Sequence, residues 1–223
     1  MTRPIAVLRP EPGNAATAAA IEAQGRRAIR LPLFRIVALP WDGPDPGAHD
    51  ALMLTSANAV RHAGPALARY ATLPVHAVGA ATAAAARAAG LQVVAKGSGD
   101  GRALLDAAQA GGVRSALLLT ARERAVASHP AVTAIAAVYA SEAIEPVDPA
   151  PLAGSIALVH SARAAARLAD IVPDRCPIAV VAISSAAAAM LGDGWRAVTV
   201  AARPDDAAVI AAAITLADTL ARD

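Results

Sequence analysis

The chain has 223 residues, of which 56% are hydrophobic and 17% charged, and its formal net charge is +2. This length allows one or two domains, and the high apolar content with so little net charge excludes global disorder. A single cysteine, Cys176, excludes disulfide, zinc-finger and iron–sulfur scaffolds.

Acidic and basic side chains nearly balance, aromatic residues make up 2% of the chain and no basic tract occurs, so we expect no nucleic-acid partner. No apolar run approaches the roughly 20 residues needed to span a membrane. The N-terminus lacks the long apolar region of a signal peptide. We therefore expect a cytoplasmic protein with no membrane partner.

Short apolar runs alternate with alanine-rich stretches through the first half. Residues 5–8 predict a strand, and Asn14 is expected to cap a helix that ends near Gly25. Further strands are expected at residues 51–54, 75–78 and 91–95, followed by helices at residues 57–70, 82–89 and 100–110.

The second half repeats this plan. Strands are expected at residues 116–119, 156–159, 178–183 and 198–201. Helices should follow the last three, ending near residues 170, 191 and 220, with caps at Ser161, Ser184 and either Asp205 or Asp206. Alternating strands and helices are typical of a parallel sheet with helices on both faces.

The two halves have matching spacings. Ser161 lies 105 residues after Ser56. Val198 likewise lies 105 residues after Val93. Such duplication indicates two similar α/β domains, although two alanine-rich halves could match by chance.

Two apolar segments, residues 31–39 and 134–144, have no helix after them and occupy matching places in the two halves. We interpret them as paired linker strands that cross between the domains. The predicted fold class is therefore α/β, with two similar domains, each a parallel sheet flanked by helices, joined by a two-stranded linker.

Ligands of open α/β sheets bind beyond the carboxyl ends of the strands. Four predicted strands end in a small polar residue or glycine that opens a helix, which offers backbone N–H groups and the positive end of a helix dipole. These positions are Ser56, residues 79–82, Ser161, and Ser184 with Ser185. Together they could bind a polyanion; the alternative is that they are ordinary helix caps.

Arginines add to this expectation, because a guanidinium can hold a carboxylate through two parallel hydrogen bonds. Five lie at or just after predicted strand ends: Arg9, Arg61, Arg122, Arg124 and Arg163. We expect some of them to contact a ligand and the others to face solvent.

Tyr139 lies on the second linker segment, where its phenol could donate a proton or a hydrogen bond. The alternative is a tyrosine that only packs in the core.

Two other motifs do not match a known site: Arg102 stands where a dinucleotide loop needs its third glycine, and the five histidines show no metal-ligand spacing. His160 and Ser161 are adjacent, so their side chains should diverge, which argues against a nucleophilic dyad.

Several short motifs occur in order along nearly the whole chain. They are VLRPEPGNAA at residues 7–16, TSANAV at 55–60, VGAATA at 78–83, the D-x-x-x-L of residues 100–104, the isolated Val138-Tyr139, and the final strand and helix. In this order, and with the internal duplication, the chain resembles the uroporphyrinogen-III synthase family.

The resemblance implies two α/β domains, with the first strand and helix in the same domain as the C-terminal part. One domain would comprise residues 1–33 and 142–223, and the other residues 37–137. Residues 34–36 and 138–141 would form the linker strands.

The resemblance also implies a reaction. The substrate would be hydroxymethylbilane, a linear tetrapyrrole polycarboxylate, which loses water, closes into a ring and inverts its last pyrrole through an azafulvene cation and a spiro intermediate. The enzyme would be a monomeric lyase without metal or other cofactor. Closure of a cleft between the domains would orient the substrate and shield the cation from water. Transient contact with the upstream synthase is also expected.

Functional positions of the family match single residues here. Tyr139 matches the linker tyrosine proposed to assist departure of the hydroxyl. Thr82 matches the threonine of the first-half turn, and Ser161 the strand-end serine of the second half. The full candidate set is Tyr139 as catalytic residue, with Arg9, Ser56, Thr82, Arg122, Ser161, Ser184 and Ser185 as substrate-binding residues.

One turn departs from the family pattern. The second half often carries an IGPTTA-like turn, where this chain has ISSAAA at residues 183–188. Backbone amides and Ser184 or Ser185 could still bind a carboxylate there. The sequence therefore leaves two alternatives to the synthase: a non-catalytic binding protein or divergent member that recognises a small polycarboxylate, and an interaction protein with a large exposed apolar patch.

Overall fold

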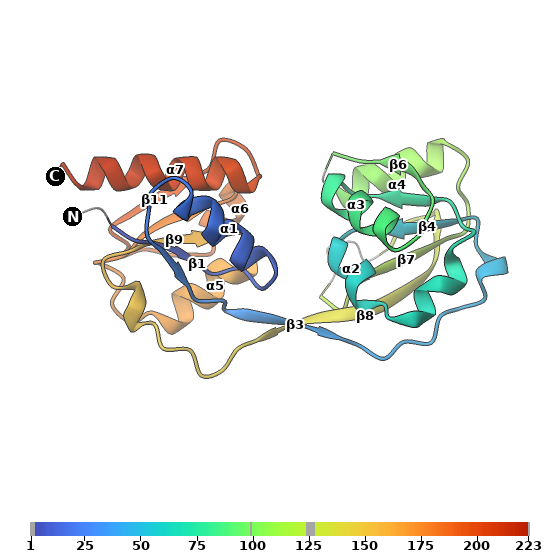
Figure 1. Ribbon diagram of the computed structural model, residues 1–223, viewed down its shortest axis with the longest axis horizontal. Coiled ribbons are helices and arrows are strands. Elements are labelled where there is room, and N and C mark those ends of the chain that lie inside the picture. The colour runs from blue at the N-terminus through green and yellow to red at the C-terminus, as the bar shows by residue number, and fades with distance from the viewer. Residues whose placement is uncertain (1–2, 99, 124–127, 223) are drawn as a thin grey trace. The chain divides into compact units, whose positions relative to one another are not determined.

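A computed structural model gives the fold and describes residues 3–98, 100–123 and 128–222. The chain divides into two compact units (Figure 1). The five-stranded unit comprises Met1–Arg35 and Ala143–Asp223, and the six-stranded unit comprises Ile36–Glu142. The five-stranded unit is built from two separate segments of sequence, so the chain leaves it after Arg35 and returns to it at Ala143.

The five-stranded unit contains a parallel sheet in the order β11-β10-β9-β1-β2. Its strands are β1 (Ile5–Val7), β2 (Ala28–Arg30), β9 (Ile156–Val159), β10 (Ala179–Ala182) and β11 (Ala197–Val200). Its helices are α1 (Gly13–Glu22), α5 (Ala162–Ile171), α6 (Ser185–Ala188) and α7 (Asp206–Leu220), with the 3-10 turn η3 (Ala150–Leu152).

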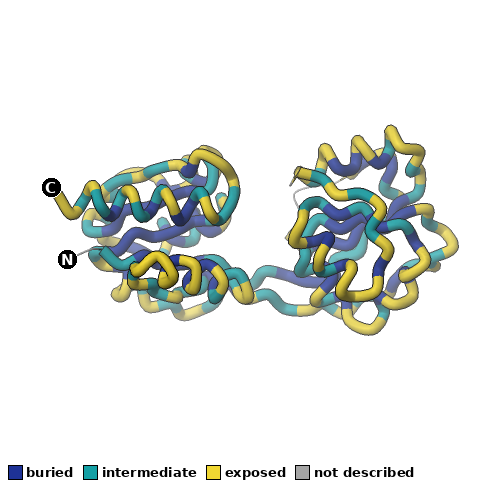
Figure 2. Tube along the Cα trace, turned by 45° about the horizontal axis from the view of Figure 1, so that its top comes forward, coloured by how far each residue is buried: buried dark blue, intermediate teal, exposed yellow. Residues whose placement is uncertain are grey.

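Alternate residues of these strands face opposite sides of the sheet. Ala6, Ala157 and Val180 face α5 and α6. Ile5 and Ile156 face α1 and α7. Both faces are therefore covered, and the central strands are buried throughout, as Figure 2 shows in dark blue.

The six-stranded unit has the strand order β3-β8-β7-β4-β5-β6. Its strands are β3 (Phe34–Ala38), β4 (Ala51–Leu54), β5 (Val75–Ala77), β6 (Val93–Lys96), β7 (Ala116–Ala121) and β8 (Val132–Ala143). Its helices are α2 (Ala57–His62), α3 (Ala80–Ala88) and α4 (Gly101–Ala110), with the 3-10 turns η1 (Pro46–Ala48) and η2 (Pro65–Tyr70). The pairings β4–β5, β5–β6, β4–β7 and β7–β8 are parallel.

Helices also cover both faces of this sheet. Leu52 and Leu117 pack with α2, η2 and α3 on one face. Met53 and Leu118 pack with α4 on the other face. The predicted fold class, two α/β domains with parallel sheets flanked by helices, is confirmed.

Several predicted element boundaries are wrong. The helix expected at residues 57–70 is interrupted, because Gly64 has φ +65° and Pro65 starts a separate 3-10 turn. The helix expected to end near residue 191 is α6, which ends at Ala188. No strand was predicted at β2, and β8 begins at Val132, two residues before the predicted start at residue 134.

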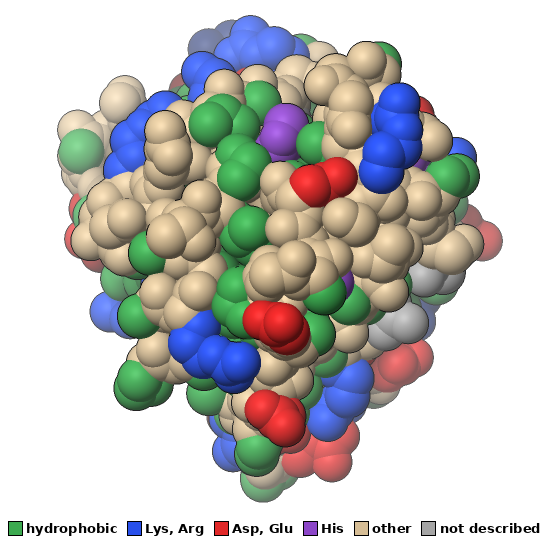
Figure 3. Space-filling view, turned by 90° about the vertical axis from the view of Figure 1, so that its right-hand side faces the viewer, with side chains coloured by type: hydrophobic (Ala, Val, Ile, Leu, Met, Phe, Trp, Pro, Cys, Tyr) green, Lys and Arg blue, Asp and Glu red, His purple; other side chains and the backbone are tan. Residues whose placement is uncertain are grey.

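On the face of the molecule drawn in Figure 3, Lys and Arg side chains are interspersed with Asp and Glu side chains. Cys176 is exposed in the five-stranded unit. Within the described residues, no helix combines the length and apolar character required to cross a membrane.

Candidate functional site

The strand order of each sheet marks one place where the chain changes direction across the sheet, and ligands of open α/β sheets bind at the carboxyl ends of such neighbouring strands. This switch lies between β1 and β9 in one unit, and between β4 and β7 in the other. Arg9 and His160 follow β1 and β9 closely, whereas Ser56 and Arg122 follow β4 and β7. Each unit therefore has its own candidate cluster.

The loop that carries Arg9 is fixed by Asn14, which is fully buried. The Asn14 side-chain amide donates to the carbonyl oxygens of Val7 at 2.7 Å and of Arg9 at 3.0 Å. Its own oxygen accepts from Nε of Arg30 at 3.0 Å. The expectation that Asn14 caps the helix is wrong: α1 begins at Gly13, and Asn14 fastens the helix to the end of β1.

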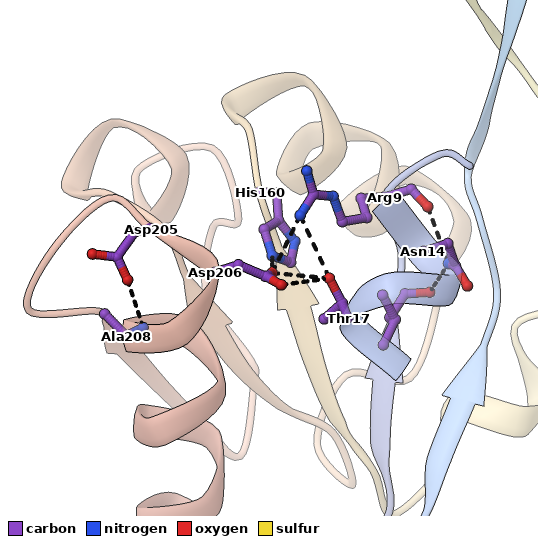
Figure 4. Close-up of polar contacts among 8 residues, drawn as sticks. Arg9, Asn14, Thr17, His160, Asp205, Asp206 and Ala208 are labelled. Atoms are coloured by element: carbon purple, nitrogen blue, oxygen red, sulfur yellow. Dashed lines mark hydrogen bonds and ion pairs between the residues drawn. The ribbon is translucent and has the colours of Figure 1, made fainter. Parts of the chain in front are cut away.

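Arg9 belongs to a polar network centred on Asp206, the first residue of α7 (Figure 4). Oδ1 of Asp206 accepts from Nη1 of Arg9 at 3.2 Å and lies 2.8 Å from Nε2 of His160. The Thr17 hydroxyl lies 2.9 and 2.8 Å from the two carboxylate oxygens and also accepts from Nη1 of Arg9 at 3.4 Å. Residues from α1, α7 and the ends of β1 and β9 thus meet at one point.

The carboxyl group of Asp206 is held in its charged form. Burial alone would raise its pKa, but hydrogen bonds from His160 and Thr17, together with nearby positive charge, lower the pKa below the ordinary aspartate value. The Nδ1 atom of His160 is buried and has no hydrogen-bond partner among the described residues. His160 therefore uses Nε2 for its contact with the protein.

The predicted serine sites of the five-stranded unit are helix caps. Oγ of Ser161 accepts from the amide of Ala164 at 3.1 Å, and Oγ of Ser184 accepts from the amide of Ala187 at 3.3 Å. Ser185 is the first residue of α6. Because α5 has 10 residues and α6 only 4, the amide end of α5 has the larger dipole to offer an anion.

In the six-stranded unit, the side chain of Ser56 lies close enough to the phenol of Tyr139 to lower its pKa. The backbone amide of Arg122 donates to the carbonyl oxygen of Tyr139 at 2.9 Å. The hydroxyl of Thr55 donates to that of Thr120 at 3.3 Å, across the switch point between β4 and β7. Three candidate residues are thus neighbours at one sheet edge.

Tyr139 is 8% exposed and lies in the apolar cluster beneath α2 and α3. Burial raises the pKa of its phenol, and the negative charge of Glu123 acts in the same direction. The ring of His62 lies 6.2 Å from the Tyr139 ring, and burial, with the charge of Arg61, lowers the pKa of that imidazole. At neutral pH the phenol therefore keeps its proton beside an uncharged imidazole.

The other candidates of this unit differ in exposure. The Arg122 side chain is 54% exposed, with Nε 2.9 Å from Glu123 and Nη2 3.9 Å from Glu142. Thr82 lies inside α3 and is 4% exposed. Among the described residues, no side-chain hydrogen bond joins Thr82 to Tyr139.

The remaining arginines have other surroundings. Arg61 donates to the side chain of Asn58 at 3.1 Å, and the guanidinium of Arg163 lies 4.5 Å above the ring centroid of Phe34. Arg124 lies outside the described residues. Of these arginines that the structure describes, Arg9 and Arg122 are the two that closely follow the strands at the switch points.

Sequence reasoning missed four polar residues of these clusters: Thr17, Thr120, His160 and Asp206. It treated Asp206 as a possible helix cap and dismissed His160 because it adjoins Ser161. The available signal was positional, since Arg9 and His160 each follow a strand and those two strands are neighbours in the sheet.

A groove of about 740 Å³ runs along α7 and β11. Its lining is mostly alanine and threonine, with Arg203 as its charged residue. The groove offers no acid–base pair, so the polar clusters remain the candidate site. No group of histidine, cysteine, aspartate and glutamate side chains that could hold a metal ion occurs in the part of the chain that the structure describes.

Comparison with known proteins points to one family. The family model described as "Uroporphyrinogen-III synthase HemD" matches residues 15–211. No curated protein gave a significant match in sequence.

Solved structures share the fold at low sequence identity. A uroporphyrinogen-III synthetase from Helicobacter pylori matches with a TM-score of 0.68 and 19% identity, over 96% of this chain and 99% of that one. A mutant uroporphyrinogen III synthase from Thermus thermophilus matches with a TM-score of 0.54 and 17% identity, over 97% of this chain and 99% of that one.

Proposed function

We propose that this chain, which belongs to the uroporphyrinogen-III synthase HemD family, converts hydroxymethylbilane into uroporphyrinogen III with loss of water. The observation that carries the proposal is the family match over residues 15–211, a range that includes Ser56, Tyr139 and Asp206. The polar clusters at the switch points supply the groups that this chemistry needs.

Tyr139 is the proposed acid. Its phenol donates a proton to the hydroxymethyl oxygen of the substrate. The carbon–oxygen bond then breaks, water departs, and the substrate carbon becomes a cation. The raised pKa keeps this proton on the phenol at neutral pH. Ser56 orients the hydroxyl, and the proton released after ring closure restores the phenol.

The substrate carboxylates are the proposed partners of the basic and amide groups. Arg9 and the amide end of α5, capped by Ser161, would bind carboxylates at the five-stranded sheet. Arg122, together with the amide end of α3, would do so at the six-stranded sheet. In this proposal Thr82 supports the amide end of α3, and Ser184 and Ser185 form the amide end of α6 as a further contact for a carboxylate.

Loss of water across a carbon–oxygen bond places the proposed reaction among the lyases. We further propose that the protein acts as a cytoplasmic monomer and receives its unstable substrate through transient contact with the upstream synthase. Sedimentation of the purified chain would test the monomer, and a shift in sedimentation on adding that synthase would test the contact.

The decisive experiment measures the isomers formed from freshly generated hydroxymethylbilane. Uncatalysed closure yields the symmetric isomer I, so isomer III in excess over the uncatalysed mixture is the expected result. Formation of isomer I alone would overturn the proposed activity. If calorimetry then showed tight binding of the polycarboxylate without turnover, the chain would be a binding protein instead.

A further inference from the structure

We propose that Asp206 is a positioning residue, which holds the Arg9 guanidinium in place to bind a substrate carboxylate. This inference rests on the proposed function and adds a residue that the sequence had suggested only as a helix cap. It depends on three features of the network: where Arg9 is held, how Asp206 is anchored, and which donors of Arg9 remain for a ligand.

Arg9 is held from two sides. Its Nη1 atom lies 3.2 Å from Oδ1 of Asp206 and 3.4 Å from the Thr17 hydroxyl. On another side it lies against Gly13, where a Cβ atom would come within 2.6 Å of Nε and 2.8 Å of Cζ. The absence of a side chain at residue 13 thus makes room for the guanidinium.

Asp206 is anchored more firmly to the protein than to Arg9. Its contacts with Thr17, at 2.9 and 2.8 Å, and with His160, at 2.8 Å, are all shorter than its 3.2 Å contact with Arg9. Thr17 is fully buried, and the side chain of His160 is 8% exposed. The carboxylate is therefore a fixed point, and Arg9 is the partner that it orients.

The network leaves part of Arg9 available. Among the described residues, only Nη1 of Arg9 has a hydrogen-bond partner; Nε and Nη2 lie beside Gly13, which has no side chain to cover them, so both remain as donors for one carboxylate. The Arg9 side chain is 35% exposed, which allows a ligand to reach it. Asp206 thus uses one end of the guanidinium and leaves the two-donor edge for substrate.

A simple charge effect would act in the opposite direction. Removing the carboxylate of Asp206 would make the region more positive and would favour binding of an anionic substrate. Asp205 provides the matched control, because it is the neighbouring residue and caps α7 by accepting from the amide of Ala208 at 2.8 Å. Asparagine caps helices about as well as aspartate, so Asp205→Asn removes a nearby charge without loosening the network.

The test compares steady-state kinetics of Asp206→Asn, Asp205→Asn, Arg9→Ala and the double variant Arg9→Ala/Asp206→Asn. For Asp206→Asn we expect KM to rise about tenfold, with kcat changed by less than about twofold. The double variant should match Arg9→Ala alone, because Asp206 acts through Arg9. Asp205→Asn should leave KM unchanged or lower it.

Several outcomes would overturn the inference. These are an unchanged or lower KM in Asp206→Asn, equal effects of Asp205→Asn and Asp206→Asn, or additive effects in the double variant. Should Asp206→Asn fail to fold, Thr17→Val serves instead, since it keeps the charge and removes the hydroxyl that anchors it; it should also raise KM. Wild-type protein that forms no isomer III would instead disprove the proposed function.

Discussion

Ser56, which caps α2, and Tyr139, on β8, have interacting side chains at the carboxyl end of the six-stranded sheet. The serine already accepts from the amide of Asn58 at 3.1 Å, so its position is set by the start of the helix. Ser56, from a distant part of the sequence, therefore orients the phenol of Tyr139. The hydroxyl of Tyr139 therefore deserves the first test.

Tyr139→Phe should lower kcat about 100-fold, the contribution typical of a positioned general acid, with little change in KM. Loss of the polar contact between the phenol and Ser56 should cost at most about 1 kcal/mol of folding free energy. Initial rates of isomer III formation and urea unfolding would measure the two effects separately.

Tyr70→Phe is the matched control. Tyr70 is fully buried, and its hydroxyl donates to the carbonyl oxygen of Pro44 at 2.8 Å, away from the switch point. We expect a similar small loss of stability and unchanged kcat. Equal losses of activity in the two variants would contradict the role of Tyr139.

Gly13→Ala should separate stability from substrate binding. Residue 13 is the first of α1, where alanine is a better helix former than glycine by up to about 1 kcal/mol, so the free energy of unfolding should stay level or rise. The new Cβ would lie 2.6 Å from Nε of Arg9 and displace its guanidinium. KM should therefore rise; an unchanged KM in a folded variant would contradict the assigned role of Arg9.

Asn14→Ala should destabilise the five-stranded unit by about 2 kcal/mol, because the Arg9 carbonyl loses this donor and the buried Val7 carbonyl keeps only the amide of Leu31, at 3.0 Å. Chemical unfolding of the full chain would measure this loss. Asn58→Ala is the control: its side chain accepts an exposed hydrogen bond from Arg61, so the expected loss is below about 0.5 kcal/mol. Similar losses in both variants would contradict the anchoring role of Asn14.

Stability should also depend on Asp206 in acid. Its folded pKa lies below the ordinary value, so its stabilisation is present above about pH 4 and is lost as the pH falls through the folded pKa. Asp206→Asn should therefore be less stable than the wild type at pH 7, by about 1 kcal/mol after solvent screening, and the difference should shrink below about pH 4.

Unfolding in urea at several pH values would measure that difference. Asp170→Asn, which removes an exposed carboxylate of α5, should show almost no difference from the wild type at any pH. A difference between Asp206→Asn and the wild type that stayed constant into acid would contradict the lowered pKa.

Much of the fold follows from local sequence. Buried runs such as residues 156–159 and caps such as Ser161 and Asp100 predict strand ends and helix starts, because capping and periodicity are local effects. The break at Pro65 was also local but was overlooked. Asn14 was misread because its partners, at the end of β1, compete with the capping role that asparagine usually plays.

The polar network was harder to foresee. Arg9 and Asp206 are 197 residues apart, and they meet only because β1 lies beside β9 while α7 packs against the same sheet. Candidate positions at strand ends could be predicted individually. Which of them are neighbours depends on strand order, which the sequence pattern does not specify.

The exposed thiol of Cys176 has a useful counterpart in the other unit. Lys96 is the only lysine of the chain, and it is exposed on β6. Maleimide and succinimidyl dyes would consequently attach at one side chain in each unit, with the α-amino group as the other amine. Energy transfer between a donor and an acceptor so placed would follow any approach of the units as hydroxymethylbilane is added, in a protein of unaltered sequence.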